Sequence, residues 1–168
     1  VSGVKYVLVD LDGNDYDGFV FMYKHSTSLA MNSTSTNAGG YAASELAPQV
    51  EALYTNLTDS DLKAAIKEVT ITCNDGDVNE TATHTYTAHM FLASAKEVGF
   101  NVSGWTYPDG YMAEGTCFDL FTTSDSSRIG FMTKANISSF WWLRSAEPLT
   151  TAYFSCVSTN GNIYINYA

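Results

Sequence analysis

The stretch WWLRSAEPLTTAYFSCVSTNGNIYINYA, residues 141–168, is the most regularly patterned part of this sequence. Two compact runs of aromatic and aliphatic residues, at 140–145 and 153–158, have the composition of β-strands. The dipeptide Asn160-Gly161 follows them and is a strong signal for a two-residue hairpin turn. The stretch therefore predicts an antiparallel sheet of three strands, the last of them in IYINYA.

Alternation in this last strand divides its side chains between two faces. Ile163 and Ile165 alternate with Tyr164 and Asn166, and a strand places successive side chains on opposite sides. We expect the two isoleucines to face the core and the other two residues to face outward.

The same separation into core-facing and outward-facing side chains is expected over the whole stretch. The framework residues, expected to anchor the backbone in the core, are Trp141, Trp142, Leu143, Phe154 and Val157. Arg144 lies inside the aromatic strand and is expected to be a framework donor to backbone or to a carboxylate. The intervening Tyr, Ser, Thr and Asn residues have the composition of antibody binding loops. The predicted ligand-binding residues are Glu147, Thr150, Thr151, Tyr153, Ser155, Ser158, Thr159, Asn160, Asn162, Tyr164 and Asn166.

The sequence of the amino-terminal half predicts two strands followed by two helices. Apolar runs around an acidic, Gly-containing turn predict strands at 4–10 and 18–24. Helical spacing of apolar residues predicts an amphipathic helix within 41–57, bent at Pro48. A second short helix is predicted to follow it, with Thr58 and Asp61 as a capping pair and Leu62, Ala65 and Ile66 on one face.

The middle of the chain is less regular. A strand ending in a turn is predicted in TITCNDGD, and another at 89–93. Ser94 and Glu97 have the spacing of a capping pair for a short helix after that strand. Residues 101–136 show few clear periods and are expected to form long, ordered loops.

Composition limits the classes of partner. The 168 residues suffice for one domain with a sizeable core, and we expect a single domain over 1–168, taken from a processed or longer protein. The net charge is −10 and the eight Lys and Arg are scattered, so we expect no face that binds a run of phosphates and no nucleic-acid partner. The apolar runs are far shorter than the roughly 20 residues needed to span a bilayer, so no direct membrane insertion is expected.

The residues that carry chemistry form no recognisable catalytic or metal motif. Cys73, Cys117 and Cys156 are interpreted as buried thiols, with one disulfide plus a free thiol as the alternative. His84 and His89 lack metal-ligand spacing, and the acidic turn beginning at Asp10 departs from a calcium loop. We therefore expect no enzyme, no metal and no cofactor. A carboxylate-pair hydrolase using residues such as Asp119, Asp125 and Glu147 stays open as a third hypothesis for the function, after the two that are given below.

Four motifs in order carry a resemblance to a known family. GGYAASEL at 39–46, LKAAIKEVT at 62–70, LASAKEV at 92–98 and WWLRS at 141–145 are similar to the motifs of a bacterial and prophage domain family. The resemblance covers about residues 38–168. Ala146 departs from it, since relatives have Pro after WWLRS, and relatives continue beyond the position of Ala168 into a closing strand.

This family looks like the C-type lectin-like fold and includes or adjoins the variable proteins of diversity-generating retroelements. The resemblance implies an α+β domain of that fold, with two short helices, small antiparallel sheets and long ordered loops. It implies a non-enzymatic module that recognises a protein or glycan receptor, in a homo-oligomer or a larger assembly. Such modules belong to a phage particle, for example a tail or head fibre, or to the extracellular or cell surface. The first alternative is a structural or decorating virion protein that uses the same face for assembly.

Overall fold

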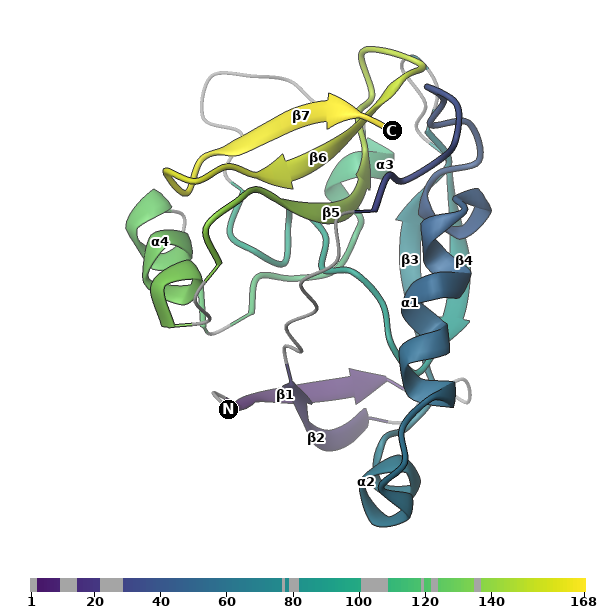
Figure 1. The fold of residues 1–168 in the computed structure, drawn as a ribbon, viewed down its shortest axis with the longest axis vertical. Coiled ribbons are helices and arrows are strands. Elements are labelled where there is room, and N and C mark those ends of the chain that lie inside the picture. The colour runs from purple at the N-terminus through teal and green to yellow at the C-terminus, as the bar shows by residue number, and fades with distance from the viewer. Residues whose placement is uncertain are drawn as a thin grey trace.

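The computed structural model describes residues 3–9, 15–21, 29–76, 78, 82–100, 109–118, 120–121, 124–134 and 137–168. These residues form a mixed α+β structure (Figure 1), in which the strands pair as three small antiparallel sheets. This confirms the predicted α+β class, with more helices in the described residues than the two that were expected.

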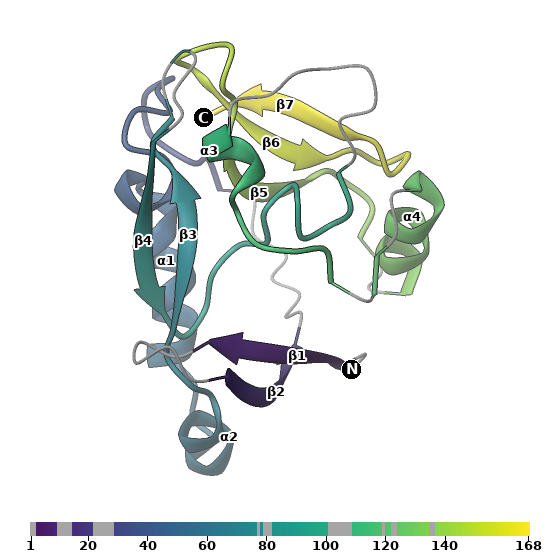
Figure 2. The same ribbon diagram turned by 180° about the vertical axis from the view of Figure 1, so that it is seen from behind.

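The amino-terminal strands form a hairpin. β1 (Gly3–Val9) pairs antiparallel with β2 (Asp15–Phe21), close to the predicted ranges, although β2 begins and ends three residues earlier. The hairpin lies at the opposite end of the structure from β7 (Ile163–Tyr167) in both views (Figures 1 and 2). The acidic turn that joins the two strands lies outside the described residues.

The predicted amphipathic helix is present. A 3-10 turn, η1 (Tyr41–Ala43), precedes α1 (Leu46–Thr55). The Ser44 hydroxyl donates to the Tyr41 carbonyl and accepts from the Ala47 N–H, which fixes the passage between them. Pro48 lies in the first turn of α1, where its missing N–H leaves no bond unmade, so it does not interrupt the helix.

The second predicted helix is α2 (Ser60–Ala65), but its cap is one residue later than expected. Asp59, not Thr58, accepts from the N–H groups of Asp61 and Leu62 at 3.0 and 2.9 Å. Asp59 prevails because its extended backbone places the carboxylate over the first turn. α2 buries no side chain, so its apolar face is uncovered.

β3 (Val69–Asn74) confirms the strand predicted in TITCNDGD, and it pairs with β4 (Thr83–Ala88). The strand predicted at 89–93 is wrong: those residues are irregular, and the strand precedes them. Their backbone groups bind side chains instead, because Glu51 accepts the His89 and Met90 N–H groups.

The less regular middle of the chain contains a capped turn and two helices. Ser94 and Glu97 do form a reciprocal capping pair, but over a turn at 95–99 rather than a helix. α3 (Asp109–Met112) and α4 (Asp125–Lys134) lie within the stretch expected to be loops. That expectation is wrong for these two helices.

The carboxyl-terminal sheet has its three predicted strands, but the connection between the last two, residues 158–162, is longer than the predicted two-residue turn. β5 (Trp141–Ala146), β6 (Tyr153–Val157) and β7 pair antiparallel in that order. Gly161 closes the turn between β6 and β7 with φ 81°, the left-handed backbone that glycine adopts without strain.

A core cluster packs against each face of this sheet, although neither face is covered over its whole area. One core cluster covers the face of Trp141, Val157 and Ile163, and contains Ala95, Val98, Tyr111, Phe118, Phe121, Met132, Leu143 and Val157. The other covers the face of Trp142 and Phe154, and contains Met31, Tyr41, Leu46, Ala47, Cys73, Ala146 and Phe154. The five predicted apolar framework residues therefore all pack into the core.

Candidate functional site

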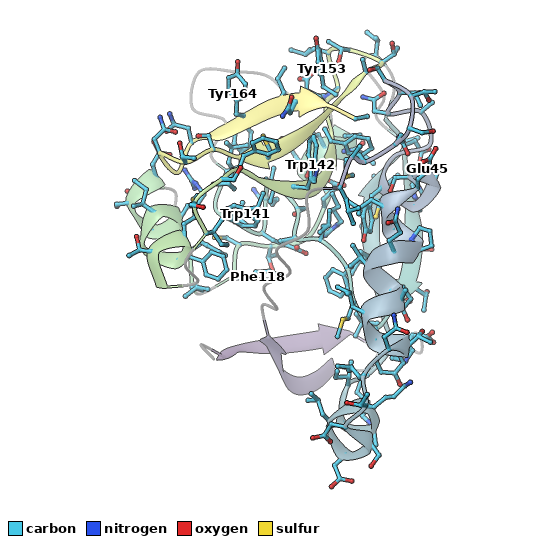
Figure 3. The ribbon with its side chains drawn as sticks, viewed as in Figure 1. Glu45, Phe118, Trp141, Trp142, Tyr153 and Tyr164 are labelled. Carbon is cyan, nitrogen blue, oxygen red and sulfur yellow. The ribbon has the colours of Figure 1, made fainter. Side chains whose placement is uncertain are left out.

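An aromatic row crosses one face of the carboxyl-terminal sheet. The strand register pairs Trp142 with Cys156 and Cys156 with Tyr164, so these side chains share a face. Phe140 precedes β5 and meets the Trp142 ring edge-on, with ring centroids 5.6 Å apart. Phe140 is 45% exposed and Tyr164 is 65% exposed. In Figure 3 the Tyr164 side chain points away from the sheet.

Only part of this face is covered by the rest of the protein. The indole Nε1 of Trp142 donates to the Leu29 carbonyl at 2.9 Å, and the second core cluster covers Phe154 beside it. We call the uncovered part, with the adjoining turn, the distal face. It consists of Phe140, Trp142, Ser158, Asn160, Asn162, Tyr164 and Asn166.

The distal face carries no formal charge of its own. In residues 137–168 the charged side chains are those of Arg144 and Glu147, which are 1% and 3% exposed. The chain as a whole has a net charge of −10. Aromatic, amide and hydroxyl groups are thus grouped in a segment that exposes no charged side chain, whereas the adjoining α4 contributes the exposed Asp125 beside Gly161.

Five predicted ligand-binding residues lie on this face. Asn160 and Asn162 are exposed like Tyr164, whereas Ser158 and Asn166 are half-buried. The Ser158 hydroxyl hydrogen-bonds Asn160 Oδ1 and the Asn162 carbonyl, which orders the turn. Thr159 is exposed in the same turn.

Two predicted ligand-binding residues are buried, so the expectation that they are exposed is wrong. Ser155 lies on the middle strand and its hydroxyl hydrogen-bonds the Tyr111 hydroxyl at 2.8 Å. Glu147 Oε2 accepts the Leu149 N–H, and burial raises the pKa of the Glu147 carboxyl group. Both residues belong to the framework.

The last three predicted ligand-binding residues, Thr150, Thr151 and Tyr153, lie at the other end of the sheet. Thr151 is exposed, while Thr150 and Tyr153 are half-buried. The Asn37 side-chain amide donates to the carbonyls of Glu147, Thr150 and Tyr153, and this fixes their loop. Figure 3 shows Tyr153 and Tyr164 apart, over different ends of β6 and β7. The structure therefore does not bring these three residues into the distal face.

Ile165 also departs from its prediction, since it is 37% exposed, whereas Ile163 packs against the first core cluster. Ile165 pairs with Ser155 on β6, and β7 is the last strand of this sheet in the described part of the chain. A small neighbour and an edge position leave its side chain partly uncovered.

Arg144 is a framework donor, as predicted. Its guanidinium makes a two-pronged ion pair with Glu97, with N–O distances of 2.6 and 2.7 Å. It also donates to three backbone carbonyls, those of Thr72, Leu92 and Glu114. Arg144 thus ties the strand that carries Trp142 to three other segments.

The two histidines in the described part of the chain, His84 and His89, have structural partners. His84 Nδ1 bonds Asp75, and His89 Nδ1 bonds Glu51 Oε1 at 2.8 Å. The His89 ring stacks on Tyr54 with centroids 3.8 Å apart, which joins α1 to the end of β4. Within the described ranges no three His, Cys, Asp or Glu side chains are grouped to hold a metal ion.

The cysteines are free thiols rather than a disulfide. Cys73 and Cys156 are buried, and burial raises the pKa of their thiols to about 12 and about 11. Cys117 is exposed, contrary to the interpretation that all three are buried.

The suggested acid and base residues have other partners. Asp125 forms an ion pair with Arg128, and Glu147 accepts the Leu149 N–H. Asp119 lies outside the described residues.

Sequence reasoning missed Phe140 as part of the site. Its position two residues before Trp142 predicts the same strand face, so period-two alternation could have found it. Asn37 gave no such signal, because its contacts are with a loop more than 100 residues away in sequence.

Comparison with known proteins gives a family but no activity. No curated protein and no solved structure matches the chain. No helix in the described ranges is long and apolar enough to cross a membrane. Residues 17–168, from β2 to the end of β7, match the family described as "Domain of unknown function (DUF6273)". The chain therefore belongs to the DUF6273 family.

Proposed function

We propose that this protein is a non-enzymatic recognition module of C-type lectin-like fold that binds a protein or glycan receptor through its distal face. Its setting would be a phage particle or a bacterial surface. The carrying observation is that exposed Phe140 and Tyr164 lie with Asn160 and Asn162 on a face whose own residues carry no formal charge. Binding interfaces are typically enriched in aromatic groups and depleted of charge at their centre.

The chemistry of the distal face suits adaptable recognition. A tyrosine gives a large contact area while fixing only two side-chain torsions, and asparagine offers both donors and acceptors. Each of these groups can bind a neutral partner without the desolvation cost of an ion. They could therefore contact sugar hydroxyls or peptide groups.

The framework under this face supports a rigid presentation. Val157 is fully buried in the first core cluster and Phe154 in the second, so β6 is held from both sides. A surface that is already ordered loses less conformational entropy on binding. Substitution of exposed residues on β7 is therefore compatible with an unchanged core.

Assembly within a virion is the second candidate, and the edge strand favours it. β7 has one strand neighbour among the described residues and contains no charged residue. An uncharged edge strand is prone to pair with another chain. In that case Tyr164 would be buried between subunits instead of meeting a receptor.

The test is Tyr164→Ala, with Leu62→Ala on α2 as the control, since Leu62 is 49% exposed and remote in sequence. Labelled protein is mixed with a panel of bacterial cells and the bound fraction is measured. Tyr164→Ala should weaken binding about 30-fold or more, as truncation of a central tyrosine costs about 2 kcal/mol. Its melting temperature should change little, because exposed substitutions fall within about 0.5 kcal/mol.

Light scattering of the same variants separates the two candidates. Dissociation of an oligomer by Tyr164→Ala would support assembly. Equal cell binding by the wild type, Tyr164→Ala and Leu62→Ala would refute recognition through the distal face.

A further inference from the structure

A single guanidinium and two carboxyl groups share the buried space between the two core clusters. Arg144, Glu97 and Glu114 are 1%, 3% and 0% exposed. They come from β5, from the turn at 95–99 and from the segment after α3. Water does not reach these groups, so their charges must be balanced by one another.

The N–H donors of Arg144 all bind groups other than the Glu114 carboxyl group. Two of its N–H groups bind the Glu97 carboxylate, and the other three bind the carbonyls of Thr72, Leu92 and Glu114. A guanidinium has five N–H donors, so all are used. The Glu114 side chain receives none of them, although its backbone carbonyl does.

One oxygen of the Glu114 carboxyl group lacks a hydrogen-bond partner, although a carboxylate needs donors at both oxygens. Oε1 accepts the Asn74 N–H at 3.0 Å, whereas Oε2 is buried without a hydrogen-bond partner. A carboxylate in this state has lost its water and regained only the Asn74 N–H and the Ser145 side chain as donors, which is a large cost. A neutral carboxyl group would have a much smaller cost, because no charge is taken out of water.

The groups that face Glu114 from other elements do not supply a second positive charge. Arg144 on β5 is the cation among the described groups that act on it, and Glu97 adds a negative charge. Cys73 on β3 faces the cluster as a thiol whose pKa is raised to about 12, so it is neutral. Tyr41 on η1 lies beyond Cys73, and burial raises the pKa of its phenol further above its usual value.

These contacts agree with the direction of the titration. Burial raises the pKa of the Glu114 carboxyl group to about 7, and Glu97 raises it as well. Arg144, Ser145 and the Asn74 N–H lower it, but by less than burial raises it.

We propose that Glu114 is a proton-operated device in the core: the folded protein holds a proton on this carboxyl group that the unfolded chain has released. Loss of the proton near neutral pH places a second negative charge beside Arg144 and weakens the junction of β3, β5 and the segment after α3. The proposal is independent of any receptor.

The sign of the pH dependence follows. The folded-state pKa lies above the unfolded-state value of 4.5, so this contribution to stability is complete below pH 4.5. It is lost as the pH rises to about 7 and changes no further above that. Over this window the folding equilibrium constant should fall about tenfold per pH unit relative to a variant without the group.

The direct test is a titration of protein labelled with ¹³C on its glutamates, in which the Glu114 Cδ shift is followed by NMR from pH 4 to 9. Glu114→Gln identifies the resonance by its disappearance, and side-chain correlation spectra assign it if that variant does not fold. We expect a midpoint near neutrality. A midpoint at or below the ordinary glutamate value would overturn the proposal.

Two variants give further readouts. In urea unfolding between pH 5 and 8, Glu114→Gln should remove the part of the wild-type pH dependence that Glu114 contributes, while the part from Glu147 remains. Glu97→Gln leaves Glu114 as the carboxylate facing Arg144, so the Glu114 midpoint should move to lower pH. An unchanged pH dependence in Glu114→Gln, or an unchanged midpoint in Glu97→Gln, would contradict the role of this cluster.

Discussion

Two glycines at different sites show how residue-scale constraints differ. Gly40 has φ 60°, and a Cβ built on it would lie 1.9 Å from the Asn74 carbonyl oxygen. Gly130 lies inside α4 on an exposed position, and a Cβ there would meet nothing within 4 Å. The first glycine is thus required by the approach of η1 to β3, and the second is not.

Alanine substitutions should therefore act in opposite directions. Gly40→Ala is expected to lower the free energy of unfolding by about 2 kcal/mol or more, because both the backbone and the contact with β3 are strained. Gly130→Ala should raise it by about 0.5–1 kcal/mol through helix propensity. Urea unfolding of the two variants measures both changes. Equal effects would mean that the contact between Gly40 and β3 is not formed.

At the scale of elements, Arg144 is the main polar junction. Arg144→Met should lower the free energy of unfolding by about 3–5 kcal/mol, because it leaves buried Glu97 charged and unpaired. The control is Lys63→Met on α2, whose ammonium group donates to an exposed carbonyl. That change should cost less than about 1 kcal/mol. Thermal and urea unfolding would both show the contrast, and a small effect for Arg144→Met would contradict the junction.

The elements differ in how well local sequence predicts them. β5, β6 and β7 were predicted because aromatic runs, alternation and an Asn-Gly turn all agree. α4 was missed because Gly130 and the serines in its first half weaken the helical pattern. Distant groups stabilise it instead, since buried Arg128 donates to the carbonyls of Gly161 and Val98.

The strand expected at 89–93 shows the opposite error. Its apolar side chains have strand composition, but Glu51 and Arg144 take up its backbone groups, so it has no ladder to join. The true strand, β4, is a run of Thr and Tyr with alternating exposure. Contacts with distant elements overrode local composition here.

At the scale of the whole molecule, the carboxyl-terminal sheet connects the two core clusters. Leu143 packs in one cluster and Phe154 in the other, and both are fully buried. We expect Leu143→Ala to lower the free energy of unfolding by about 2–5 kcal/mol and Phe154→Ala by about 3–5 kcal/mol. Because the clusters share one sheet, tryptophan fluorescence and circular dichroism should report the same transition midpoint. Separate midpoints in either variant would show that the clusters unfold independently.

The sequence predicted the candidate site only in part, because the burial of its residues depends on how the whole molecule packs. Alternation placed Tyr164 correctly, because an edge strand has few neighbours that could cover it. It failed for Ser155 and Glu147, because Tyr111 and the loop held by Asn37 cover positions that look polar in the sequence. Burial depends on elements that local patterns do not position.

The neutrality of residues 137–168 has a consequence for how such a surface would operate in different media. An association with a neutral partner through uncharged groups releases few counterions, so its affinity should stay nearly constant between dilute buffer and seawater. The remaining acidic surface would meanwhile slow the approach to other acidic surfaces at low ionic strength. For an acidic partner, added salt would therefore speed the encounter and leave the lifetime of the complex unchanged, so the affinity would rise with salt.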